Sequence, residues 1–183
     1  MSCGEIDLKC RKCRLSDKRT KVVPGTGPCN ARLVLIGEAP GRDEDLRGEP
    51  FVGRAGKLLD AALDECGVSR KSVYITNVVK CRPPKNRKPR DEEATTCSEY
   101  LFSELEDVKP SVVCILGQTA AKHLLSERRS MSALSKEDFE MIIDGRHVKV
   151  FVTFHPAACL YQRKHLKAFK TSIRKSLESA GLA

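Results

Sequence analysis

The chain is organised around residues 33–41, which read Leu33-Val34-Leu35-Ile36-Gly37-Glu38-Ala39-Pro40-Gly41. Four consecutive apolar residues followed by glycine and proline predict a buried parallel strand that runs into a turn. Because ligands of open α/β sheets bind at the carboxyl ends of the strands, we expect Glu38 at the mouth of such a sheet. The alternative that this stretch leaves open is an ordinary turn with a solvated glutamate.

Apolar strands and amphipathic helices alternate along the rest of the chain, which predicts a doubly wound α/β fold with a mostly parallel sheet and helices on both faces. Glu38, Asn77 and His155 each come at or just after the end of a strand, so this sheet would bring all three to one edge. The segment 126–145 is polar and is expected to be an insertion or a loop with a short helix. Further strands are predicted at 72–79, 111–117 and 147–154, and helices at 54–66, 91–108, 118–125 and 164–180.

The composition predicts a water-soluble protein of one domain. Its 183 residues, 20.3 kDa, are enough to bury a sizeable core. There is no apolar run of membrane-spanning length, and the first residues do not resemble a signal peptide, so an intracellular, cytoplasmic protein without membrane contact is expected. Nine cysteines, an odd number, point in such a chain to metal ligands and buried thiols more than to disulfides.

Positive charge is concentrated in three blocks, at residues 9–21, 80–90 and 163–175, and the formal net charge is +9. A polyanion such as nucleic acid is the natural partner of such blocks. A merely soluble cationic surface is the alternative.

Four cysteines lie in polar or basic surroundings, and together they could bind one metal centre. The first two have two residues between them, so they can bind a metal from one turn, and the other two could complete a four-thiolate set. Zinc and iron–sulfur clusters both accept four thiolates, and a redox pair is a further alternative. The four are Cys10, Cys13, Cys81 and Cys97; Cys114 is expected in the core, and Cys3, Cys29, Cys66 and Cys159 are expected to be non-ligands.

Several motifs, in order, resemble those of the uracil-DNA glycosylases of family four. They are residues 37–45 (GEAPGRDED), 48–56 (GEPFVGRAG), 76–84 (TNVVKCRPP) and 155–158 (HPAA), together with the cysteine pattern. The resemblance covers nearly the whole chain. It implies a three-layer α/β/α fold with a central four-stranded, mostly parallel sheet, in one domain spanning residues 1–183 with an N-terminal cluster-ligand segment. It also implies a 4Fe-4S cluster on Cys10, Cys13, Cys81 and Cys97.

The resemblance also implies roles for individual residues in excising uracil. Phe51 would stack on the uracil ring, Asn77 would pair with uracil O4 and N3–H, and His155 would donate to O2 as negative charge develops there. The remaining assignments follow the same motifs. Glu38 and Asn86 would position or activate water, Ala39 and Glu44 would contribute to the substrate pocket, Glu44 against thymine's methyl group, and Leu160, Arg163, Arg82 and Lys85 would contact DNA.

The implied function is a DNA repair enzyme that flips uracil out of DNA, hydrolyses its N-glycosidic bond and leaves an abasic site. Its partner would be uracil-containing DNA, single- or double-stranded, and it would act as a monomer. The main alternative is a non-catalytic iron–sulfur or zinc module that binds nucleic acid, and a second is a zinc protein that binds RNA.

Overall fold

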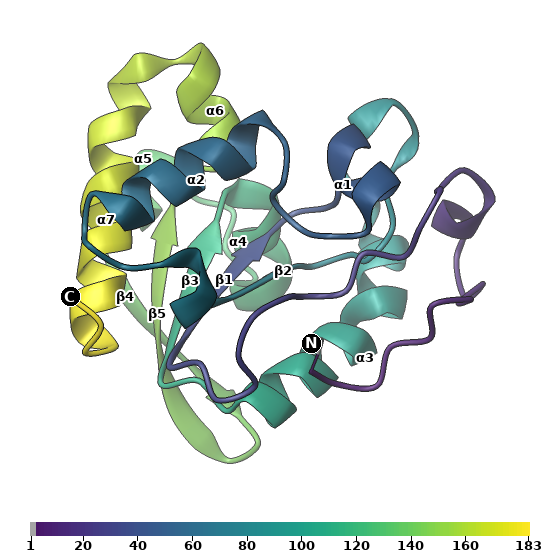
Figure 1. Cartoon of the computed structure of the whole chain (residues 1–183), viewed down its shortest axis with the longest axis horizontal. Helices are drawn as coiled ribbons and strands as arrows, with labels where there is room; N and C mark the ends of the chain where they lie inside the picture. The colour runs from purple at the N-terminus through teal and green to yellow at the C-terminus, as the bar shows by residue number, and fades with distance from the viewer. Residues whose placement is uncertain (1–2) are drawn as a thin grey trace.

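The computed structural model describes residues 3–183, and its centre is a five-stranded sheet in the order β2-β1-β3-β5-β4 (Figure 1). Four of these strands run parallel to one another, as the alternation of strands and helices predicts. Their apolar residues are buried on both faces, which is typical of parallel strands. The parallel strands are β1 (Leu33–Gly37), β2 (Tyr74–Asn77), β3 (Val112–Leu116) and β5 (Arg146–Thr153).

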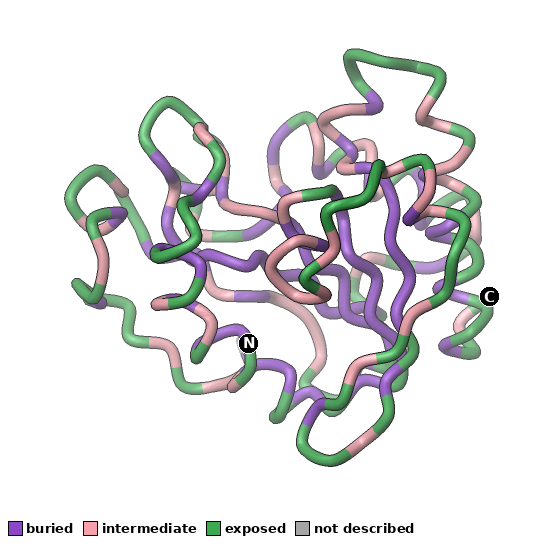
Figure 2. Tube along the Cα trace, turned by 180° about the vertical axis from the view of Figure 1, so that it is seen from behind, coloured by how far each residue is buried: buried purple, intermediate pink, exposed green. Residues whose placement is uncertain are grey.

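Helices cover both faces of the sheet, so the fold is the expected three-layer arrangement. Alternate residues of a strand point to opposite faces. Leu33 and Leu35 pack in a cluster with α2 (Arg54–Asp64) and α7 (Leu166–Ser179). Val34 and Ile36 pack in a second cluster with α3 (Asp91–Val108) and α4 (Gln118–Leu125). Figure 2 shows the buried strands between the more exposed outer segments.

The fifth strand corrects the expectation of four strands and of a loop across 126–145. This segment contains the expected short helix, α5 (Met131–Leu134), but also β4 (Asp138–Ile143), which pairs antiparallel with β5. Phe139 and Met141 pack against the core while acidic residues face solvent between them. Asp144 and Gly145, with φ of 49° and 70°, form the turn of this hairpin, and an Asp-Gly pair is a recognised signal for one.

Two short helices that the sequence did not predict frame the carboxyl edge of the sheet. They are α1 (Arg42–Arg47), directly after β1, and α6 (Pro156–Tyr161), directly after β5. Four 3-10 helices complete the part of the chain that the structure describes: η1 (Arg14–Asp17), η2 (Arg70–Ser72), η3 (Pro84–Asn86) and η4 (Arg163–His165). Within residues 3–183, no helix has the length and hydropathy needed to cross a bilayer.

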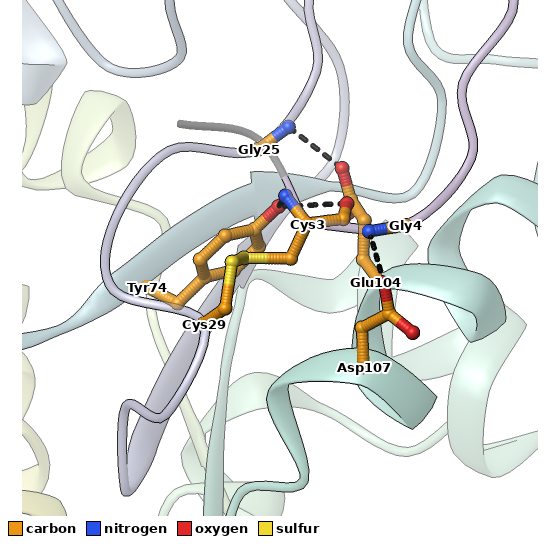
Figure 3. The surroundings of a disulfide bond; sticks show 7 residues. All are labelled: Cys3, Gly4, Gly25, Cys29, Tyr74, Glu104 and Asp107. Atoms are coloured by element: carbon orange, nitrogen blue, oxygen red, sulfur yellow. Dashed lines mark hydrogen bonds between the residues drawn. A yellow bond between two sulfur atoms is a disulfide. The ribbon is translucent and has the colours of Figure 1, made fainter.

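A disulfide joins Cys3 to Cys29, which were expected to be non-ligands; the bond corrects the expectation that the cysteines serve as metal ligands and buried thiols more than as disulfides (Figure 3). The Cys3 N–H donates to the Tyr74 hydroxyl of β2 at 3.3 Å, and the Gly4 N–H donates to Asp107 of α3 at 2.7 Å. The amino-terminal segment, which has little regular structure of its own, is therefore fastened to the body of the protein by covalent and polar contacts.

Candidate active site

A cavity of about 370 Å³ opens at the carboxyl edge of the sheet, where β1, β2 and β5 end. This volume lies in the range of small-molecule pockets. The cavity also receives Arg87 from the basic loop after β2, and Ala157 and Ala158 from α6. Every residue predicted to bind or cut the substrate lines it: Glu38, Ala39, Glu44, Phe51, Asn77, Asn86 and His155.

Asn77 ends β2 with a side chain that is only 2% exposed and has an unpaired acceptor. Its Oδ1 atom is buried and accepts no hydrogen bond. Asn77 pairs in the sheet with Gly37, where a Cβ atom would lie 2.4 Å from this oxygen, so only glycine allows the approach. Because an unpaired buried acceptor costs about 1–3 kcal/mol, the amide is suited to a ligand that supplies an N–H group.

Phe51 lies beside Asn77 in a backbone conformation that its neighbours impose. Its φ of 53° is in the left-handed region, which a bulky residue rarely adopts. A Cβ on Gly37 would lie 2.5 Å from its Cζ atom, and one on Gly56 would lie 1.8 Å from its carbonyl oxygen. Glycines on both sides thus leave room for the ring and its backbone, and the ring is 4% exposed.

Glu44 and Arg70 hold the loop that carries Phe51. The Glu44 carboxylate accepts from the N–H groups of Val52 at 2.9 Å, Gly53 at 2.8 Å and Gly41 at 3.1 Å. Arg70 donates to the carbonyl oxygens of Phe51 at 3.0 Å and of the preceding residue at 2.5 Å. These contacts fix the loop from two sides, and Arg70 is a residue that the sequence patterns did not single out.

His155 caps the amino end of α6 and faces the Phe51 ring. Its Nδ1 atom accepts from the Ala157 N–H at 3.1 Å, and the two rings lie 5.7 Å apart. Burial lowers the pKa of His155 to about 4, so the imidazole is neutral at pH 7. Since Nδ1 accepts a hydrogen bond, the proton resides on Nε2, which can donate to a ligand.

Glu38 and Asn86 lie at the mouth of the cavity. Glu38 follows β1 and is half-buried, and within residues 3–183 its carboxylate has no hydrogen-bond partner. Asn86 is exposed, and its Oδ1 accepts from Nε of Arg82 at 2.7 Å. Lys85 and Asn86 both have φ of 55°, so this loop is a second place where the backbone is strained beside the cavity.

The residues predicted to contact DNA do not line the cavity but lie in segments next to residues that do: Arg82 and Lys85 in the loop that holds Asn86, Leu160 in α6, and Arg163 just after α6. Lys85 and Arg163 are exposed, Arg82 is half-buried, and Leu160 of α6 is 36% exposed. Its neighbour Tyr161 is 83% exposed, and it follows Ala157 and Ala158 by one helical turn. The structure thus adds an exposed aromatic side chain to these segments.

The four predicted cysteine ligands line one small cavity near the amino-terminal segment. The Lys80 N–H donates to the Cys97 sulfur at 3.3 Å, and Arg19 donates to the Cys81 sulfur at 3.5 Å. Burial raises the pKa of Cys81 to about 12, so a metal would have to displace its proton. Within residues 3–183 no three His, Cys, Asp or Glu side chains stand close enough to hold a single metal ion. Four soft sulfur ligands with N–H donors around one site nevertheless fit a metal cluster.

A buried ion pair joins the two sites. Nζ of Lys80 donates to Glu104 at 2.6 Å, to the Thr76 hydroxyl at 2.6 Å and to the Asn77 carbonyl at 2.9 Å. Glu104 also accepts from the Gly25 N–H at 2.7 Å, as Figure 3 shows. Lys80 therefore connects the pocket residue Asn77 with the cysteine site, and no local sequence pattern identifies this pair.

Comparison with known proteins assigns a class to this fold and pocket. The sequence profile of the uracil DNA glycosylase superfamily matches residues 24–178. The chain belongs to this superfamily.

Within this superfamily, the chain is similar to several type-4 uracil-DNA glycosylases. The chain is 44% identical to a type-4 uracil-DNA glycosylase of Archaeoglobus fulgidus, over 95% of this chain and 89% of that protein. It is 42% identical to the type-4 uracil-DNA glycosylase of Saccharolobus solfataricus, over 93% and 82% of the two chains. The corresponding protein of Sulfurisphaera tokodaii is 40% identical, over 94% and 81%. The resemblance seen in the motifs therefore extends over most of the chain.

Proposed function

We propose that the protein is a DNA repair enzyme that removes uracil from DNA by hydrolysing its N-glycosidic bond. The observation that supports this most is the unpaired, buried Oδ1 atom of Asn77 in a cavity that also holds Phe51 and His155. Uracil offers an N–H donor between two carbonyl acceptors, which matches this set of groups. The complete pocket argues against a non-catalytic module.

Uracil would be recognised by its face and its edge. The Phe51 ring supplies a flat apolar surface that suits any pyrimidine. The Asn77 amide accepts from N3–H and donates to O4, whereas cytosine presents the reverse pattern and would be disfavoured by about 1–3 kcal/mol. Glu44 acts through the loop that carries Phe51, because its carboxylate is bound to backbone N–H groups. We propose that this fixed loop excludes thymine's methyl group.

Bond cleavage would depend on His155 and on water at the cavity mouth. When the C1′–N1 bond breaks, its electron pair goes to uracil, and Nε2 of His155 donates to O2, where negative charge grows. The Glu38 carboxylate stabilises the cationic sugar and accepts a proton as the oxygen of water bonds to C1′. Asn86 positions this water through its amide.

The cysteine site would hold a 4Fe-4S cluster on Cys10, Cys13, Cys81 and Cys97. Such a cluster would supply four thiolate bonds that join the amino-terminal segment, the end of β2 and α3. Cys81 begins the basic loop of residues 80–90, so a cluster would also hold this loop against DNA. No step of the hydrolysis proposed above involves the cysteines.

We also propose a substrate, an oligomeric state and a cellular location for the enzyme. The substrate is uracil-containing DNA, which the basic loop and the exposed residues of α6 would bind. One chain supplies every residue that lines the cavity, so we propose that a monomer is active. We also propose an intracellular, cytoplasmic location and a single domain over residues 1–183.

Release of uracil tests this function directly. A labelled duplex with one uracil opposite guanine is incubated with the protein and treated with alkali, which breaks the strand at an abasic site. We expect breakage at uracil and none at thymine or cytosine in matched duplexes. Asn77→Ala should reduce the rate by about 10²-fold, because it removes the group that pairs with the base. Asn30→Ala, which changes an exposed asparagine, is the control. Absence of breakage with a folded, cluster-containing protein would reject the proposal.

A further inference from the structure

A groove of about 530 Å³ lies beside α7, away from the candidate active site. Its cations occur at positions 163, 167, 170 and 174, a spacing of four, three and four residues that aligns them on one face of a helix. A further lysine, Lys175, lies beside this row. The groove is lined by Arg163 of η4 and by Lys167, Lys170, Arg174 and Lys175 of α7, together with Glu65, which follows α2; we call these five cations the α7 stripe.

The stripe is rigid because the other face of the helix is held in the core. Phe169, Ile173 and Leu177 of α7 are fully buried against the sheet. The ring of His165, just before α7, stacks on Phe154 at 4.0 Å. These contacts fix the rotation of α7, so its basic face must point to solvent.

The positive charge of the stripe is almost uncompensated. Lys170 pairs with Glu65, but within residues 3–183 the other four cations form no ion pair. By contrast, several cations elsewhere are paired, such as Arg87 with Glu93 and Lys122 with Asp91. Like charges on one helix face repel each other, so this arrangement suits a partner that brings negative charge.

The chain links the stripe to the candidate active site through α6 and η4. His155 caps α6 and Ala158 belongs to it, both residues line the candidate cavity, and η4 joins α6 to α7. Figure 1 shows α2, α6 and α7 together on one side of the sheet. Asn86 and Arg87 of the basic loop of residues 80–90 also line the cavity. Both basic segments, this loop and the segment that leads through α6 to α7, therefore contribute to the cavity or continue from it.

The shape of the stripe indicates an extended polyanion. Within α7 the stripe runs from Lys167 to Lys175, which gives a length of about 12 Å at 1.5 Å per residue, and Arg163 of η4 extends it. The part within α7 spans about three to four base-pair steps along a DNA duplex. The groove is open and its cations are mostly exposed, unlike a closed site for a single small anion.

We propose, on the basis of the proposed glycosylase function, that the α7 stripe binds the phosphate backbone on one side of the flipped nucleotide. The basic loop of residues 80–90 would bind the backbone on the other side. The enzyme would thus hold duplex DNA on both sides of the uracil, and the two contacts would be separable by shortening one arm of the duplex.

The experiment compares Lys167→Gln/Lys175→Gln with a control, Lys71→Gln/Lys109→Gln. The control removes the same charge from exposed lysines just before β2 and β3, at the opposite edge of the sheet. Equilibrium binding is measured to a long duplex with a stable abasic analogue at its centre, and to two duplexes that are shortened on either side. Single-turnover uracil release on the matching uracil duplexes gives the cleavage rate at saturation.

We expect the stripe variant to bind the long duplex several-fold more weakly than the control, with an unchanged rate at saturation. The slope of log affinity against log salt should become about 2 less steep, because two phosphate contacts are lost. The stripe variant should bind as tightly as the control when the duplex arm that contacts the stripe is shortened. It should still bind more weakly than the control when the other arm is shortened.

Equal binding by the two variants on all three duplexes would overturn the proposal. So would weaker binding of the stripe variant to phosphatidylserine vesicles alone, which would indicate a membrane surface instead. If the unaltered protein releases no uracil, the glycosylase function fails, but the binding comparison still tests the stripe.

Discussion

At the scale of single residues, the chemistry of the pocket depends on a neutral histidine. The ordinary pKa of 6.5 is lowered to about 4 in His155 because the ring is shielded from water. Between these two pH values the unfolded chain binds a proton that the folded chain does not. His155 therefore lowers the free energy of unfolding as the pH falls through this range, and it has no such effect above it.

We predict that the His155 ring titrates near pH 4 in the folded protein. Its ring-proton chemical shift, followed by NMR and assigned from the signal lost in His155→Gln, should stay constant from pH 7 to 5. A His155 midpoint near 6.5 would contradict the neutral donor and the Ala157 hydrogen bond to its Nδ1.

We also predict that Arg70 controls the position of Phe51. Arg70→Met should leave the Phe51 carbonyl without a donor and lower the free energy of unfolding by about 1–3 kcal/mol. Because the left-handed conformation of Phe51 then loses support, kcat/KM for uracil release should fall by about tenfold. Thermal unfolding and steady-state kinetics measure the two effects.

The adjacent Lys71→Met is the matched control for this prediction, because no contact of the Lys71 side chain stabilises the loop. If Arg70→Met and Lys71→Met have equal kinetics, the loop does not depend on Arg70.

At the scale of elements, the helices and strands that could be predicted are those with a clear local sequence pattern. The apolar run of β1 and the three-and-four spacing of α7 indicate their structures without knowledge of the fold. In α1, by contrast, the residues are almost all charged, and its place depends on Asp45, whose carboxylate accepts from the Thr20 N–H at 2.8 Å. β4 is an edge strand with an acidic outer face, so only its hairpin turn identifies it.

We predict that the Lys80–Glu104 pair couples β2 to α3. Glu104→Leu should lower the free energy of unfolding by about 3–5 kcal/mol, because it leaves the Lys80 ammonium buried without its carboxylate. Lys80→Met should also lower the free energy of unfolding, because it leaves the Glu104 carboxylate buried without its ammonium partner. The double variant should be less destabilised than the sum of the two changes.

Denaturant unfolding of the two single variants and the double variant measures this coupling. Additive losses would mean that the two charges contribute independently, and that the network around Thr76 does not link the elements.

At the scale of the whole molecule, topology explains why the candidate site could be predicted. A parallel sheet brings the ends of distant strands to one edge, so Glu38, Asn77 and His155 converge as expected. The supporting residues could not be predicted in this way. Lys80 meets Glu104, and Arg70 meets Phe51, only because of pairings between distant segments that no local pattern records.

We predict that loss of the cluster weakens DNA binding more than it alters chemistry. Cys81→Ala should abolish visible absorbance from the cluster and weaken binding to duplex DNA, because the basic loop after β2 loses its anchor. The residual product should still be an abasic site. Cys66→Ala, which removes a half-buried thiol outside the cysteine site, is the control. If Cys81→Ala loses the cluster but binds duplex DNA as tightly as before, the position of the basic loop does not depend on the cysteines.

Gly37 has a consequence for the history of such a chain. It carries no reactive group, yet any side chain there would occupy the space in which Phe51 and Asn77 meet. Replacement of Gly37 by another residue therefore cannot be neutral while the pocket is under selection. We expect a larger residue at position 37 only in descendants that no longer bind uracil. In a lineage, a change at this position would therefore mark the branch by which the activity had been lost.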